Sequence, residues 1–120
     1  MKSSSADNPI IKKTYSFALR VIQVYKVLNE ERKEWVLSKQ LLRSGTSIGA
    51  NVREGIQGQS KKDFISKMAI ALKEAQESDY WICLLRDSKF LSEKESTSLL
   101  ADLDEIIAIL TAILKTSRNN

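Results

Sequence analysis

The chain has 120 residues, of which 42% are hydrophobic and 28% are charged, and this balance excludes an intrinsically disordered protein and fits one folded domain. Its formal net charge of +4 at pH 7 permits contact with nucleic acid or with an acidic partner. With no histidine and a single cysteine, Cys83, the chain lacks the ligands of zinc, haem and iron–sulfur sites and the commonest catalytic base, so we expect no metal and no cofactor.

The same composition predicts where the protein works. No stretch approaches the roughly 20 apolar residues that span a bilayer, and the opening residues MKSSSADNP lack the apolar run of a secretory signal. A lone cysteine fits a reducing compartment. We therefore expect a soluble, cytoplasmic protein with no membrane contact.

The first helix is predicted to follow a flexible tail of residues 1–8. Asn8 can cap the helix, and Pro9 suits the first helical position because its missing N–H costs nothing there. The helix is predicted to end in the segment NEERKE, residues 29–34. Apolar residues at helical spacing give its expected buried stripe: Ile11, Tyr15, Ala18, Val21 or Ile22, Tyr25 and Leu28.

The second helix is predicted to begin near Glu34 or Trp35 and to include residues 43–54, RSGTSIGANVRE. Gly45 and Gly49 are four apart, so on a helix they expose bare backbone on one face. A glycine inside a helix costs about 1 kcal/mol relative to alanine, and the close approach of another helix is the simplest compensation. A phosphate-binding loop is excluded because no lysine follows the second glycine. We predict a helix here, with both glycines facing a partner helix at short separation.

A stripe of small and polar side chains accompanies the glycines on helix two. It consists of Arg43, Ser44, Ser47, Asn51 and Glu54. On the third helix Glu74 and Glu77 share a face, and they are either an acid–base pair of a small enzyme, or a site for a hard cation, or hydrogen-bond partners of this stripe. We favour the structural interpretation.

The third and fourth helices begin with the same capping pattern, Ser60 with Asp63 and Ser92 with Glu95. The apolar residues of each helix recur at the spacing of a bundle seam, and no window alternates as a strand would. We therefore predict an all-α protein, an antiparallel up-down-up-down four-helix bundle of residues 9–116, with a flexible tail of residues 117–120. The predicted seams are Phe64, Met68, Ala71, Ala75, Ser78, Ile82 and Leu85 on helix three, and Leu99/Leu100, Leu103, Ile106/Ile107, Leu110 and Ile113/Leu114 on helix four.

Helices one and three carry more apolar residues than one buried face requires. This surplus predicts a subunit interface, with a thick core as the alternative. The residues are Phe17, Leu19, Val24 and Val27 on helix one, and Ile65, Ala69, Ile70, Leu72, Tyr80, Trp81, Cys83 and Leu84 on helix three.

The charges are unevenly distributed, because residues 1–73 carry 14 basic and 6 acidic side chains while residues 74–120 carry 5 and 9. The two halves of neighbouring copies could therefore meet head to tail in a ring. The basic half could equally contact the phosphates of RNA or DNA. The residues that we expect to do so are Lys12, Lys13, Arg20, Lys26, Lys61 and Lys62.

Two stretches, LLRSGTSIGANVREG and SKKDFISKMAIALKEAQESDYWICLL, resemble the four-helix bundle proteins of the 23S rRNA intervening-sequence family. The resemblance covers about residues 8 to 116. The matching positions are Leu42, Arg43, Ser44, Ser47, Ile48, Asn51, Glu54 and Gly55 in the first stretch, and Phe64, Ala71, Glu74, Ala75, Glu77, Leu84 and Leu85 in the second.

The resemblance implies a ring-forming bundle, typically a homopentamer, with no established enzymatic activity and no catalytic residues to carry over. A similar fold occurs in the accessory protein of diversity-generating retroelements, a basic pentamer that works with a reverse transcriptase and nucleic acid. We therefore expect a non-enzymatic homo-oligomer that binds nucleic acid. The alternatives are a scaffold or accessory subunit for a protein encoded nearby, or a small enzyme that uses Glu74 and Glu77.

Overall fold

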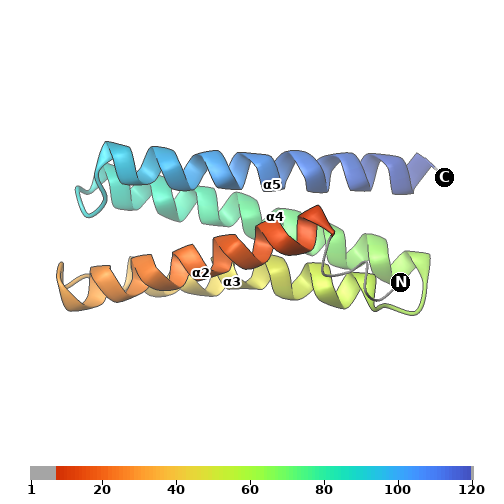
Figure 1. Ribbon diagram of the computed structural model, residues 1–120, viewed down its shortest axis with the longest axis horizontal. Helices are drawn as coiled ribbons and strands as arrows, with labels where there is room; N and C mark the ends of the chain where they lie inside the picture. The colour runs from red at the N-terminus through yellow and green to blue at the C-terminus, as the bar shows by residue number, and fades with distance from the viewer. Residues whose placement is uncertain (1–7, 120) are drawn as a thin grey trace.

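A computed structural model describes residues 8–119 of the protein as four long helices joined by short links. The helices are α2 (Pro9–Glu30), α3 (Leu37–Ile56), α4 (Lys61–Asp87) and α5 (Glu93–Asn119). The ribbon reverses direction at each link (Figure 1), and each helix packs against the two beside it, α2 against α3 and α5 and α4 against α3 and α5. The predicted antiparallel four-helix bundle is confirmed.

The ends of the bundle differ in part from the predicted boundaries. Residues 1–7 and 120, which belong to the predicted tails, lie outside the described residues. Helix α5 continues to Asn119, beyond the predicted domain end at residue 116. No glycine or proline occurs between 115 and 119, so nothing in the sequence breaks the helix there.

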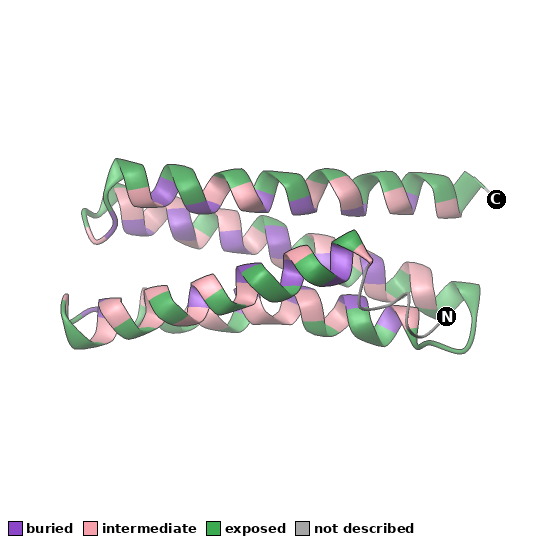
Figure 2. Cartoon of the chain, in the orientation of Figure 1, coloured by how far each residue is buried: buried purple, intermediate pink, exposed green. Residues whose placement is uncertain are grey.

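The core consists of one buried stripe from each helix, and these stripes face inward (Figure 2). The seams predicted for α4 and α5 are confirmed. On α4 the buried residues are Met68, Ala71, Ala75, Ser78, Ile82 and Leu85, with Phe64 partly buried, and on α5 they include Leu99, Leu103, Ile106, Leu110 and Leu114.

The stripe predicted for α2 is wrong in part. Tyr15 is 55% exposed, whereas Phe17, which we assigned to the apolar surplus, is 1% exposed and belongs to the core. The real stripe passes through Thr14, which the pattern could not recognise as buried because threonine is polar. Its hydroxyl donates a hydrogen bond of 2.7 Å to the carbonyl oxygen of Ile10, and this bond satisfies the hydroxyl inside the bundle.

Helix α3 begins at Leu37, later than predicted. The carboxylate of Glu34 accepts hydrogen bonds from the backbone N–H groups of residues 36–38, so it caps the helix instead of belonging to it. Trp35 and Val36 lie between Glu34 and the start of the helix. Both stay outside the core and are 55% and 67% exposed.

The glycine stretch is helical, and its two glycines face α2 as predicted. A Cβ atom on Gly45 would lie 2.9 Å from Cγ2 of Val21, and one on Gly49 would lie 3.2 Å from Oγ1 of Thr14. Since real Cβ atoms essentially never approach other atoms as closely as 2.9 Å, glycine at position 45 is what allows α2 to lie this near to α3. The predicted short separation is confirmed.

This contact predicts the effect of enlarging Gly49. The Gly49→Leu variant should lose about 1–3 kcal/mol of its free energy of unfolding, because the added side chain must push α2 away. Chemical denaturation monitored by circular dichroism measures the loss. The neighbouring exposed Ala50 supplies the control, since Ala50→Leu should change stability by less than about 0.5 kcal/mol. Equal stability of Gly49→Leu and the wild type would refute the packing role.

Candidate functional site

The predicted polar stripe of α3 faces α4, and its centre is a buried pair of serines. Oγ of Ser44 lies 2.8 Å from Oγ of Ser78, and both side chains are fully buried. Ser78 also donates to the carbonyl oxygen of Glu74. Each hydroxyl therefore has a partner inside the core, and the pair fixes the register of α3 against α4.

Arg43 joins the two predicted carboxylates to α3. Its guanidinium donates to Glu74 at 3.3 Å and also to Glu77. Glu77 accepts a further bond from the indole Nε1 of Trp81 at 3.1 Å. Both carboxylates thus hold Arg43 of α3 against α4, which favours the structural interpretation.

The rest of the stripe makes other bonds than we expected. The hydroxyl of Ser47 donates to the carbonyl oxygen of Arg43, and the amide of Asn51 donates to that of Ser47, so both side chains bond their own helix. Glu54 pairs with Lys67 of α4 at 2.9 Å. The short reach of serine and asparagine lets them satisfy themselves locally, and only Arg43 is long enough to reach Glu74 and Glu77.

The six predicted phosphate-binding residues fall into two groups. Lys13 forms an ion pair with Glu105 at 3.1 Å, and Arg20 forms one with Asp102 at 2.7 Å while also donating to the backbone and hydroxyl of Ser98. Their partners all lie on α5 of the same chain. The opposite charges that we expected to meet between copies thus meet within one chain at these positions.

The other four cations are exposed and make no ion pair with any residue between 8 and 119. They are Lys12, Lys26, Lys61 and Lys62. Lys61 and Lys62 open α4, whose first residues lie at the same end of the bundle as the start of α2 and therefore of Lys12 (Figure 1). The structure therefore leaves a smaller free basic surface than the sequence suggested.

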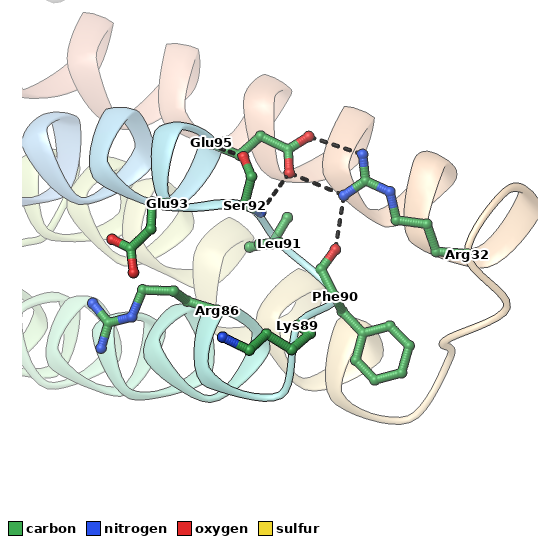
Figure 3. A pocket seen from close by; sticks show the side chains of 8 residues that line it. All are labelled: Arg32, Arg86, Lys89, Phe90, Leu91, Ser92, Glu93 and Glu95. Atoms are coloured by element: carbon green, nitrogen blue, oxygen red, sulfur yellow. Dashed lines mark hydrogen bonds and ion pairs between the residues drawn. The ribbon is translucent and has the colours of Figure 1, made fainter.

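A pocket of about 440 Å³ lies at the opposite end of the bundle, where the link after α2 meets the turn between α4 and α5. Sequence reasoning missed it, although it predicted the Ser92–Glu95 capping box that forms part of its wall. Its lining is shown in Figure 3: Arg32, Arg86, Lys89, Phe90, Leu91, Ser92, Glu93 and Glu95.

Arg32 is the centre of this junction. Its guanidinium donates two bonds to the Glu95 carboxylate, at 3.0 and 2.9 Å, and one to the carbonyl oxygen of Phe90 at 2.7 Å. Glu95 in turn accepts from the backbone N–H of Ser92, and Ser92 caps the N–H of Glu95. The junction joins the end of α2 to the start of α5. No sequence signal pairs Arg32 with Glu95, which is 63 residues away.

The hydrogen bonds from Arg32, followed by the bond from the backbone of Ser92, lower the pKa of Glu95 to about 2. Elsewhere, burial raises the pKa of the Cys83 thiol, with a further contribution from its hydrogen bond to Asp79. A thiol with a raised pKa stays protonated near neutral pH and is a weak nucleophile. Across the described part of the chain, no three His, Cys, Asp or Glu side chains are grouped closely enough to hold a metal ion.

Comparison with known proteins decides the family. A sequence model of the family described as 23S rRNA-intervening sequence protein matches residues 6–112. The chain belongs to this family. Its resemblance to the intervening-sequence proteins is therefore confirmed over most of its length.

A solved structure supports the same conclusion. The match is the crystal structure of a protein with unknown function from the S23 ribosomal protein family of Bacteroides thetaiotaomicron. The sequence of that protein is 49% identical to this chain. The match covers 91% of this chain and 97% of that one, with a TM-score of 0.89. No curated protein matches the sequence. None of the helices in the described residues combines the length and the apolar character needed to cross a membrane.

The Arg32–Glu95 pair predicts a pH dependence of stability. Because the pKa of Glu95 is lowered on folding, its contribution is complete above its unfolded value of 4.5 and is lost as the pH falls towards 2. The pair is partly exposed, so we expect no more than about 1 kcal/mol. Glu95→Gln should flatten the decline in unfolding free energy over this range, measured by urea denaturation at several pH values. Glu93→Gln, which changes an exposed neighbour, should keep the wild-type decline.

Proposed function

We propose that this member of the family acts without catalysis, as a homo-oligomeric bundle that presents lysines to nucleic acid. The observation that carries the proposal is the large apolar side chains left on the outside of helices α2 and α4. Leu19 of α2 is 49% exposed, and Ile70 and Tyr80 of α4 are 38% and 57% exposed. Exposed apolar residues of this size usually mark an interaction surface.

The arrangement of these residues supports a closed ring more than a two-fold dimer. Helices α2 and α4 do not pack against each other, because each is separated from the other by α3 and α5. Their outer faces therefore point to different sides of the bundle, and one copy can contact two neighbours through two different surfaces. Such head-to-tail contacts close into a ring when the rotation fits. The family resemblance favours five copies. The single cysteine fits a protein of the reducing cytoplasm.

The absence of catalysis is supported by the state of the two candidate acids. Glu74 and Glu77 are held by Arg43, and the chain has no histidine to act with them. The small-enzyme alternative would need at least one carboxylate free to reach a substrate.

The assembly can be tested with one charge substitution on α4 and a control on α5. Light scattering at micromolar concentration should give a mass several times the 13.6 kDa of one chain. Tyr80→Glu should shift the protein towards the monomer, because it places a charge in the contact. Thr111→Glu, on the exposed face of α5, should leave the mass unchanged. A monomeric wild type would contradict the proposal.

Nucleic-acid binding rests on four of the six predicted lysine and arginine residues, which form no ion pair with any described residue. In a ring each copy repeats them, so contacts that are weak singly act together. Since Lys13 and Arg20 are engaged by α5, we assign phosphate contacts to Lys12, Lys26, Lys61 and Lys62. Lys61 and Lys62 also stand at the first turn of α4, where free backbone N–H groups favour anions.

This assignment predicts the salt dependence of binding. The binding of RNA and DNA in a filter assay should weaken as the salt concentration rises. In the double variant Lys61→Gln/Lys62→Gln, the slope of the logarithm of the binding constant against the logarithm of the salt concentration should become shallower by about one for each phosphate that is no longer neutralised. The paired cation Lys13 supplies the control, because Lys13→Gln should change the slope much less. If the oligomer binds neither polymer at about 50 mM salt, the scaffold for a protein encoded nearby becomes the better interpretation.

A further inference from the structure

The seam between α2 and α5 differs from the others in how it is held. These two helices are the least closely packed of the four neighbouring pairs. Ion pairs bridge the seam at three levels from α2 and the link that follows it: Lys13–Glu105, Arg20–Asp102 and Arg32–Glu95. All six side chains are between 34% and 62% exposed, so salt in the solvent can screen them.

Two surface grooves lie along the same seam. The smaller, of about 280 Å³, lies beside the Lys13 and Asp102 side chains. The larger, of about 410 Å³, extends between Arg20 and Arg32. Its floor is apolar and includes Leu28 and Leu99, which are 0% and 1% exposed. Core side chains therefore form the bottom of a surface groove here.

The seams on either side of α3 contain buried contacts that salt does not weaken, although ion pairs of Arg43 and Lys67 also cross the α3–α4 seam. Gly45 brings the backbone of α3 against Val21 of α2, and the buried Ser44–Ser78 hydrogen bond joins α3 to α4. Local opening of a protein takes the path with the fewest buried contacts. In this bundle that path is the α2–α5 seam.

We propose that the bundle opens reversibly between α2 and α5, and that the three ion pairs act as a salt-sensitive latch on this opening. When the latch is released, the apolar floor of the larger groove becomes accessible from solvent while the α2–α3 and α3–α4 contacts stay closed. The inference does not depend on the proposed oligomer or on nucleic-acid binding.

Thiol labelling tests the opening directly. The full-length protein would carry Cys83→Ser, which removes its single cysteine, and then either Leu99→Cys in the seam or Ile48→Cys in the core of α3. Both positions are buried, and both substitutions remove a similar volume, so the weakened core packing affects them alike. The rate of reaction with DTNB should be on the order of tenfold higher at residue 99. It should rise further between about 0.05 and about 1 M KCl.

A matched pair of charge substitutions separates the latch from a general loss of stability. Asp102→Asn should raise the rate at residue 99 in low salt and reduce its response to KCl. Glu54→Gln removes an ion pair of similar exposure between α3 and α4, and it should leave the rate unchanged.

Three results would overturn the proposal. Equal rates at residues 99 and 48 would mean that the protein opens only by global unfolding. If neither KCl nor Asp102→Asn changes the rate at residue 99, the ion pairs do not hold the seam. If Glu54→Gln raises that rate as much as Asp102→Asn does, the effect does not depend on where the ion pair lies. If Leu99→Cys lacks the helical circular dichroism of the parent, Leu28→Cys reports on the same groove, is equally buried and must meet the same criteria.

Discussion

The close contact between α2 and α3 is the constraint on which the rest of this bundle depends. Because Gly45 and Gly49 have no side chains, the backbone of α3 lies against Val21 and Thr14. Alanine would be the better residue for an isolated helix, so the two glycines give up local helix stability for tertiary packing. The buried threonine of α2 fits the same contact, since its hydroxyl is satisfied by its own helix while its Oγ1 and Cβ face Gly49.

That contact explains why the two sides of α2 are held differently. One side is drawn against α3 by apolar packing, and the other faces α5 across a wider seam that carries grooves and ion pairs. The basic first half and the acidic last helix of the chain thus attract each other inside one molecule. Of the six predicted phosphate contacts, this internal neutralisation leaves four lysines for the proposed nucleic-acid contact, and the outer faces of α2 and α4 carry the proposed contacts between copies.

The polar groups inside the bundle have structural partners. Ser44 bonds to Ser78, Arg43 holds Glu74 and Glu77, and the Arg32–Glu95 junction closes the end of the molecule. In the described residues, no buried side-chain nitrogen or oxygen is left without a hydrogen-bond partner. These groups are thus engaged within the fold, and the proposed function uses the outside of the bundle.

The sequence by itself determined the number and type of the helices, the serine caps of α4 and α5, the seams of α4 and α5 and the close approach at the glycines. These features are local, because helical spacing and caps depend on residues within a few positions of one another. Only the tertiary structure decided which face of α2 is buried, since that face includes the polar Thr14, whose hydroxyl bonds to the carbonyl oxygen of Ile10. It also decided that Glu34 caps α3 and that Arg32, Lys13 and Arg20 find their partners on α5 or beside it. These pairings join residues far apart in the chain, and charge patterns along a sequence do not state which helices become neighbours.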